Sequence, residues 1–140
     1  MSLPRPENSA TPSRRLRVLY AEDVKELREV ARMILTVMGH TMESAEDGQQ
    51  ALDRVNRGLD DFDVIITDHH MPAMNGLEFV HELRALSYRG KILVFSSDLD
   101  PGTAVLYRLL KVDGIFNKPV PPKLVREILA ELFPPDAPRP

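Results

Sequence analysis

The sequence predicts an α/β fold with a doubly wound, five-stranded parallel sheet in which each strand is followed by a helix. Short apolar runs rich in β-branched residues alternate along the chain with segments whose apolar residues recur every three or four positions. The strand segments are almost continuously apolar, as expected for strands buried on both faces by helices. All seven glycines fall at or near the breaks between segments. Right-handed crossovers then give a doubly wound sheet.

Each strand is predicted from a short run of β-forming residues. The five runs are Arg17–Ala21, Thr41–Ala45, Val64–Thr67, Lys91–Phe95 and Gly114–Phe116. The first helix follows from apolar residues at helical spacing between Val24 and Met38, and it should end at Gly39. The second should start after Asp47-Gly48 and end near Gly58.

The last three helices carry clear start signals. Asn75 and Glu78 form a capping box at the start of the third helix, which uses Leu77, Val80, Leu83 and Leu86. Asp100 followed by Pro101 is typical of a helix cap and first turn, and this fourth helix should run to about Leu110. The fifth should follow Pro121-Pro122.

Length and composition indicate one soluble domain, 15–133, between mobile tails at 1–14 and 134–140. The chain has 140 residues, and seven of its twelve prolines lie in these tails. A formal net charge of −3 argues against direct nucleic-acid binding. The sequence has no membrane span, no signal peptide and no cysteine, so we expect a cytoplasmic protein.

Polar side chains follow four of the predicted strands at the point where each strand ends. Because the carboxyl ends of parallel strands share one rim of the sheet, these side chains should converge there. They are Glu22, Asp23, Asp68, Ser96 and Lys118. The two outermost members of this set are 96 positions apart in sequence.

The predicted cluster holds three acids and a single lysine, so it needs a cation. Two carboxylates roughly 4–5 Å apart repel by about 4 kcal/mol at an effective dielectric of ~20. One ammonium group does not offset three such contacts. Oxygen ligands without cysteine favour a hard ion, and Mg²⁺ is the expected cofactor. Asp68 could then attack an incoming phosphorus atom in line, while Lys118 and the metal stabilise the charge on the phosphoryl oxygens.

These motifs resemble the receiver domain of bacterial two-component response regulators. The resemblance covers about Leu16 to Leu132 and rests on Glu22-Asp23, the block Asp68-x-x-Met-Pro-x-Met-x-Gly, the hydroxyl of Ser96, and Lys118-Pro119. It implies a flavodoxin-like strand order, 2-1-3-4-5, as in chemotaxis regulators.

The resemblance also implies site roles and partners. Asp68 would accept a phosphoryl group from a histidine kinase or a histidine phosphotransfer protein, and Lys118 would pair with that group across a cis peptide bond to Pro119. Mg²⁺ would be held by Asp23, Asp68 and the backbone carbonyl of His70, with Glu22 acting mainly through water. Such a domain is a signalling switch and not a metabolic enzyme, because it promotes only its own phosphorylation and dephosphorylation.

Two residues define the expected switch, Ser96 and Ile115. The family usually carries Tyr or Phe three residues before the lysine, where this chain has Ile115. How Ser96 would be coupled to the rest of the domain is therefore open. An alternative function is a phosphate-independent interaction module that keeps the fold without the switch. An enzyme binding flavin or nucleotide lacks support, because no glycine-rich loop follows the first strand.

Some features allow a plainer interpretation. Asp23 with Glu26 three residues later also fits a helix cap. His69-His70 suggests zinc, but neighbouring side chains on an extended chain point apart and the sequence has no cysteine.

The apolar residues of the fourth helix exceed the width of one buried stripe. They are either core or a surface for a downstream protein, an output domain absent from this chain, or a phosphorylation-linked homodimer formed with the fifth strand and helix.

Overall fold

The computed structural model describes residues 14–135, so most of the two predicted tails lies outside the described residues. The strands are β1 Arg17–Ala21, β2 Thr41–Ala45, β3 Val64–Thr67, β4 Lys91–Ser96 and β5 Gly114–Asn117. The helices are α1 Lys25–Val37, α2 Gly48–Asn56, α3 Gly76–Ala85, α4 Pro101–Leu109 and α5 Pro122–Leu132. All ten predicted elements are present.

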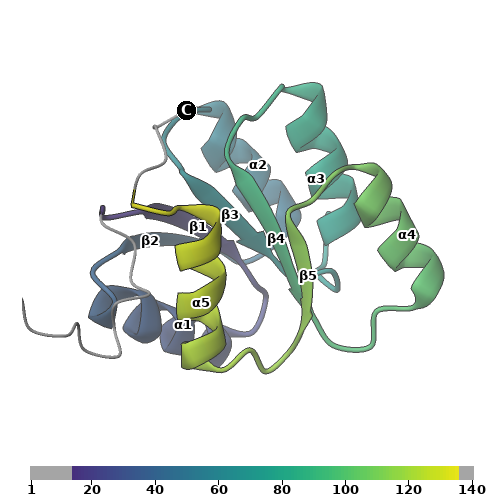
Figure 1. The fold of residues 1–140 in the computed structure, drawn as a ribbon. Coiled ribbons are helices and arrows are strands. Elements are labelled where there is room, and N and C mark those ends of the chain that lie inside the picture. The colour runs from purple at the N-terminus through teal and green to yellow at the C-terminus, as the bar shows by residue number, and fades with distance from the viewer. Residues whose placement is uncertain (1–13, 136–140) are drawn as a thin grey trace, which may run out of the picture.

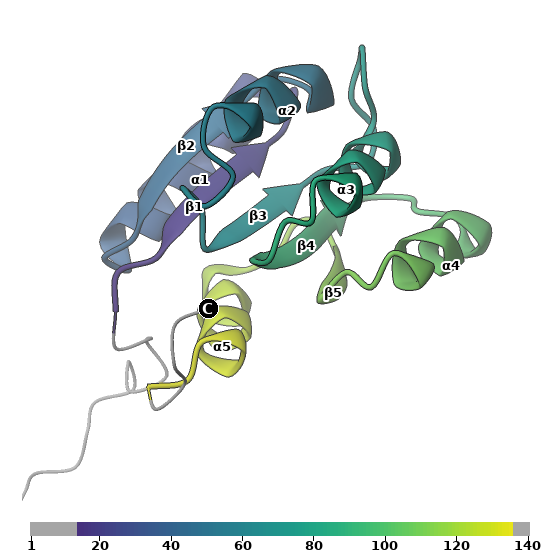
Figure 2. The same cartoon turned by 90° about the horizontal axis from the view of Figure 1, so that it is seen from above.

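The five strands form one parallel sheet in the order β2-β1-β3-β4-β5, which confirms the predicted strand order. Helices α1 and α5 lie on one face, and α2, α3 and α4 lie on the other (Figures 1 and 2). Successive residues of β1 therefore enter different cores: Leu19 packs with α2 and α3, and Val18 packs with α5. The central strands β1, β3 and β4 contribute apolar side chains to both cores, as their almost continuously apolar sequences predicted.

Three helices have a side-chain cap at their start, and two of these caps, Asn75 and Asp100, were predicted from the sequence. The Asp47 side chain accepts a hydrogen bond from the Gln50 amide at the start of α2. Asn75 and Glu78 form the reciprocal capping box of α3. Asp100 accepts from the Thr103 amide, with a proline in the first turn of α4. These caps satisfy amides that would otherwise lack partners and fix where the connecting loops end.

Helix α1 differs from this pattern in two ways. Its N-cap is Val24 and no side chain caps it, so the interpretation of Asp23 as a helix cap is wrong. Its apolar stripe is also only partly covered, because Leu35 alone within the helix is buried. Leu27 and Val30 are 39% and 48% exposed. The spacing of apolar residues predicts the helix, which is present, but spacing alone does not say how closely a helix approaches its neighbours.

A cavity explains this exposure. It has a volume of about 590 Å³, and its walls come from α1, from the sheet and from the segment that leads into α5, including Leu27, Ile66 and Val120. Asp68 and Lys118 also line it. Within residues 14–135, no helix has the length and apolar content needed to span a lipid bilayer.

Candidate functional site

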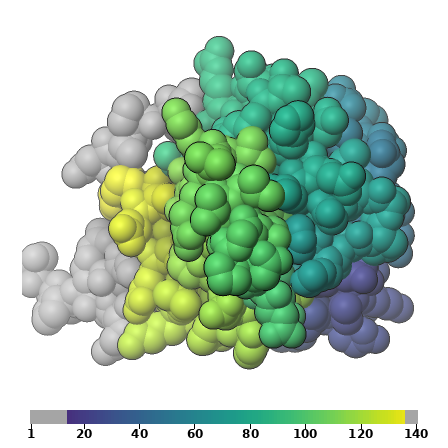
Figure 3. All heavy atoms as spheres, turned by 90° about the vertical axis from the view of Figure 1, so that its right-hand side faces the viewer, coloured from purple at the N-terminus to yellow at the C-terminus, as the bar shows by residue number. Residues whose placement is uncertain are grey.

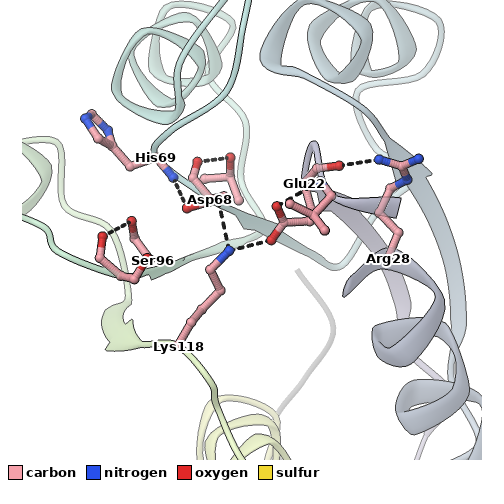
Figure 4. A network of polar contacts seen from close by, with 9 residues as sticks. Glu22, Arg28, Asp68, His69, Ser96 and Lys118 are labelled. Carbon is pink, nitrogen blue, oxygen red and sulfur yellow. Dashed lines mark hydrogen bonds and ion pairs between the residues drawn. The ribbon is translucent and has the colours of Figure 1, made fainter. Parts of the chain in front are cut away.

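The carboxyl ends of β1, β3 and β5 bring Glu22, Asp68 and Lys118 into direct contact. Lys118 Nζ donates one hydrogen bond to Glu22 Oε1 at 2.6 Å and another to Asp68 Oδ2 at 2.9 Å. Figure 4 shows the ammonium group between the two acids. Lysine and carboxylates from separate parts of the chain thus meet at the predicted rim.

A third acid completes the cluster. Carboxylate oxygens of Glu22, Asp23 and Asp68 all lie within 4.8 Å of one another. Glu22 and Asp68 are buried, whereas Asp23 is exposed at the mouth of the site. At this separation each pair of carboxylates repels by about 3 kcal/mol at an effective dielectric of ~20. Three negative charges and one positive charge leave the cluster short of two positive charges.

This donor set fits a hard divalent cation. All three side chains offer oxygen atoms, as Mg²⁺ prefers, and the exposed Asp23 leaves room for water ligands. His69 and His70 are not part of this group of metal-ligating side chains, which is the one such group among residues 14–135. The structure therefore provides an acidic pocket whose ligand atoms suit Mg²⁺.

The charges of the cluster affect each other's ionisation. Burial raises the pKa of the Glu22 carboxyl, and the charge of Asp68 adds to this effect while the hydrogen bond from Lys118 opposes it. Burial alone would lower the pKa of Lys118, but its hydrogen bonds to Glu22 and Asp68 outweigh burial and the pKa is raised. Lys118 is thus firmly held in its charged form.

Main-chain contacts hold the acids in place. The Asp68 amide donates to the Ala21 carbonyl at 2.9 Å, and Asp68 Oδ1 accepts a hydrogen bond from the His69 amide at 2.7 Å. Arg28 donates from α1 to the carbonyl oxygen of Glu22 at 2.8 Å. Sequence reasoning missed Arg28, because a side-chain bond to a main-chain carbonyl leaves no pattern in the sequence.

Ser96, His70 and Ile115 occupy different positions around this cluster. Ser96 is buried at the end of β4, on the opposite side of Asp68 from Glu22, and its hydroxyl donates to the Ser97 carbonyl at 3.2 Å (Figure 4). His70 is exposed and lines the cavity together with Asp68. Ile115 is partly buried and packs against the core cluster between the sheet and α2, α3 and α4. The peptide bond between Lys118 and Pro119 is cis, as the family resemblance implied.

Two further residues adjoin the site without having been predicted. His69 Nδ1 lies 2.7 Å from the hydroxyl oxygen of Tyr107, a fully buried residue of α4. Burial lowers the pKa of His69, with the neighbouring His70 adding to the effect. Burial also raises the pKa of the Tyr107 hydroxyl. A signal was available: Tyr107 is the one residue of the α4 apolar run that has a polar tip, and such tips usually find a partner when buried.

Comparison with known sequences identifies the family. The sequence model of the response regulator receiver domain matches residues 18–130. A chemotaxis protein CheY homolog of Campylobacter jejuni is 31% identical over 121 residues, which cover 84% of this chain and 92% of that protein. The two-component response regulator ORR41 of Oryza sativa subsp. japonica is 30% identical over 118 residues, which cover 83% of this chain and 93% of that protein.

Other relatives are much longer than this chain. The sensory/regulatory protein RpfC of Xanthomonas campestris is 30% identical over 123 residues, but the chain spans only 17% of its length. Among solved structures, the chemotaxis protein CheY4 of Vibrio cholerae superposes with a TM-score of 0.77 at 29% identity, covering 85% of this chain and 99% of that one. The sheet order, the acidic cluster and these matches agree, and the chain belongs to the response regulator receiver domain family of two-component signalling.

Proposed function

We propose that this domain accepts a phosphoryl group on Asp68 from a phosphohistidine and thereby switches a protein-binding surface. The observation that carries the proposal is the contact of Lys118 with both Glu22 and Asp68, next to a third carboxylate. A cluster short of positive charge is costly to keep for structure alone, whereas a site for a divalent cation and a phosphoryl group needs this charge balance.

The chemistry is a transfer between two phosphoryl acceptors. A carboxylate oxygen of Asp68 attacks the phosphorus atom, and the bond from phosphorus to the donor imidazole nitrogen breaks. The imidazole leaves with the bonding electron pair, and Asp68 becomes an acyl phosphate. Lys118 already donates to Asp68 Oδ2 and is placed to donate to a phosphoryl oxygen instead. Asp23, Asp68 and the His70 carbonyl would hold Mg²⁺, with Glu22 acting mainly through water, and the bound ion would offset the negative charge of the phosphoryl oxygens.

The cavity between α1 and α5 supports a protein as phosphoryl donor. Asp68 lines it, and α1 presents exposed apolar side chains along its length. These are Val24, Leu27, Val30, Met33 and Val37. A helix of a histidine kinase or histidine phosphotransfer protein that packs against them would bring its phosphohistidine to the mouth of the site.

Incubation with acetyl phosphate, or with beryllofluoride as a phosphoryl analogue, tests the proposal in the presence of Mg²⁺. We expect one adduct per chain, detected by intact mass for phosphate and by ¹⁹F NMR for beryllofluoride. Asp68→Asn should abolish it. Asp63→Asn is the matched control, because Asp63 is similarly buried at the other end of β3 and should leave the adduct intact. An adduct that survives Asp68→Asn would overturn the proposal.

The alternative is a receiver-like module that binds its partner without phosphate. Ile115 favours this alternative, because the usual aromatic switch residue is absent. The effect of beryllofluoride on the domain distinguishes the two functions. If beryllofluoride forms its adduct at Asp68 and leaves both the structure of α4 and the affinity for a partner unchanged, the domain is such a module.

A further inference from the structure

A chain of contacts leads from Asp68 to helix α4, and it does not pass through the expected switch residues Ser96 and Ile115. His69 follows Asp68 directly, and its amide donates to Asp68 Oδ1 at 2.7 Å. Its imidazole Nδ1 lies 2.7 Å from the hydroxyl oxygen of Tyr107, 38 positions away on α4. One residue thus contacts the expected phosphoryl acceptor with its main chain and α4 with its side chain.

Tyr107 is fixed in its place by close packing. It has no exposed surface and belongs to the same core cluster as Phe79 and Val94. Its hydroxyl points to the loop after Asp68, where Gly76 donates from its amide to the His69 carbonyl at 2.9 Å. A Cβ atom at position 76 would lie 2.5 Å from the Tyr107 hydroxyl. The absence of a side chain at Gly76 therefore gives the hydroxyl access to His69.

This hydrogen bond constrains both partners. A buried hydroxyl that loses its partner is strongly disfavoured, so Tyr107 and His69 should shift together when either one moves. The ring of Tyr107 lies in a core packed as densely as a crystal, where small displacements are passed on to neighbouring side chains. A change at the Asp68 carboxylate that alters its bond with the His69 amide therefore has a direct mechanical route to α4.

Helix α4 is suited to display such a change. Ala104 and Tyr107 are its buried residues, and they anchor it to the core. Its other face presents Val105, Leu106 and Leu109, which are 49%, 47% and 72% exposed. Figure 3 shows the side of the molecule on which α4 (green) lies, with α4 at its centre and open to solvent. A shift of the anchoring tyrosine would move these apolar side chains at the surface.

The usual route in the family is absent or altered in this chain. Position 115 carries Ile and not an aromatic residue, and the Ser96 hydroxyl donates to the neighbouring Ser97 carbonyl. We propose that the hydrogen bond between His69 and Tyr107 transmits the state of Asp68 to α4 and so controls its exposed apolar face. The inference rests on the proposed function, because it requires that Asp68 changes state.

The test compares two tyrosines that differ in position. Tyr107→Phe removes the hydroxyl that bonds to His69. Tyr88→Phe is the matched control, because Tyr88 is also buried and its hydroxyl donates to a main-chain oxygen of Phe62 at 3.0 Å, at the far end of the sheet. Each variant loses one buried hydrogen bond, so thermal unfolding should report similar losses of stability. The readouts are the ¹⁹F NMR signal of bound beryllofluoride and the ¹H-¹⁵N shifts of α4 amides, both in Mg²⁺.

We expect the wild type and Tyr88→Phe to form the adduct and to shift the amides of Val105, Leu106 and Leu109. Tyr107→Phe should form the adduct with α4 shifts reduced about fivefold. Because coupling between two sites is reciprocal, its affinity for beryllofluoride should also change by roughly fivefold or more. Tyr107→Phe with wild-type α4 shifts overturns the inference. A wild type without any adduct overturns the proposed function itself, so the two failures are distinguishable.

A second variant tests the hydrogen bond from its other end. His69→Leu removes the imidazole and keeps the main-chain amide that bonds to Asp68. If the bond is the route, His69→Leu, Tyr107→Phe and the double variant should show the same residual α4 response to beryllofluoride. A response that falls further in the double variant would mean that the two residues act separately, which overturns the inference. This comparison remains decisive if either single variant loses stability.

Discussion

Strand β3 has a buried aspartate at each end, and the two ends use their charge in opposite ways. At the amino end, Asp63 accepts hydrogen bonds from the Arg17 amide at 2.8 Å and from two nitrogens of the Arg17 guanidinium. The acid at this end is thus paired with a base. At the carboxyl end, Asp68 shares a single lysine with Glu22 and lies near a third carboxylate. The contrast agrees with our proposal, in which the paired end contributes to stability and the Asp68 end binds a cation and a phosphoryl group.

The pKa values reflect the same difference. Burial alone would raise the pKa of Asp63, but the hydrogen bonds from Arg17 outweigh it and hold the pKa below its ordinary range. Burial raises the pKa of Glu22 at the other end, in spite of its bond to Lys118. Asp63 is therefore stabilised in its charged form by its surroundings, whereas Glu22 is destabilised in that form until more positive charge arrives.

Mg²⁺ should neutralise the excess negative charge around Asp68, and it should produce the largest of the expected effects on the free energy of unfolding. A ligand that binds only the folded state at about 100 times its Kd raises the free energy of unfolding by about 2.7 kcal/mol. Asp23→Asn should abolish most of this gain, and it should slightly stabilise the metal-free domain by relieving repulsion. Urea unfolding with Mg²⁺ or with EDTA measures both effects.

Asp98→Asn is the control for the metal experiment, because Asp98 is exposed near the same rim and does not belong to the carboxylate group. It should retain the full gain from Mg²⁺. An equal gain in Asp23→Asn would show that the cation binds elsewhere. The acidic cluster at the Asp68 end of β3 would then not be a metal site.

Neutralising the two aspartates that flank β3 should show that Asp63 contributes more to stability than Asp68 does. Asp63→Asn should lower the free energy of unfolding by about 2 kcal/mol, because it weakens charged hydrogen bonds to Arg17. Asp68→Asn should change it by less than about 1 kcal/mol, since the loss of attraction to Lys118 and the loss of repulsion from two acids nearly cancel. Urea unfolding without Mg²⁺ provides the comparison, and a larger loss in Asp68→Asn than in Asp63→Asn would contradict it.

The smallest effect is a pH dependence at the amino end of the sheet. His40 is 4% exposed, its Nδ1 accepts a hydrogen bond from the Leu16 amide, and burial together with the charge of Arg15 lowers its pKa. A His with a lowered folded-state pKa contributes full stability above its unfolded pKa of about 6.5 and loses it as the pH falls further.

The free energy of unfolding should therefore fall as the pH drops below about 6.5, by at most about 1.4 kcal/mol per pH unit from this group. His40→Asn keeps an acceptor for the Leu16 amide but does not titrate, so its stability should be flatter over this range. Denaturant unfolding at several pH values tests this, and identical slopes in the two proteins would rule out His40 as the cause.

Much of this structure could be predicted because its signals are local. Helix caps at Asn75 and Asp100 depend on a few neighbouring residues, and each is present as predicted. The acidic cluster needed one further rule, that parallel strands end at a common rim, and the contacts of Lys118 confirm this convergence. The phosphoryl transfer itself stays a prediction.

What could not be predicted depends on distances between elements. The spacing of apolar residues placed α1 correctly but did not reveal that Leu27 and Val30 face a cavity. The bond between His69 and Tyr107 requires the loop after β3 and the middle of α4 to come within 2.7 Å, which no local pattern encodes. Such contacts are set by how the helices pack on the sheet.

The placement of the tyrosines has a practical consequence for spectroscopy. The chain has no tryptophan and three tyrosines, so excitation at wavelengths beyond the absorption of phenylalanine gives fluorescence from tyrosine alone. Tyr88 lies at the end of the sheet away from Asp68, Tyr20 lines the cavity, and Tyr107 contacts His69. Tyr20 and Tyr107 therefore lie close enough to the site for a bound ligand to change their fluorescence. Single Tyr→Phe variants would separate the contribution of each tyrosine to the signal. The domain carries its own optical reporter, with no dye to attach.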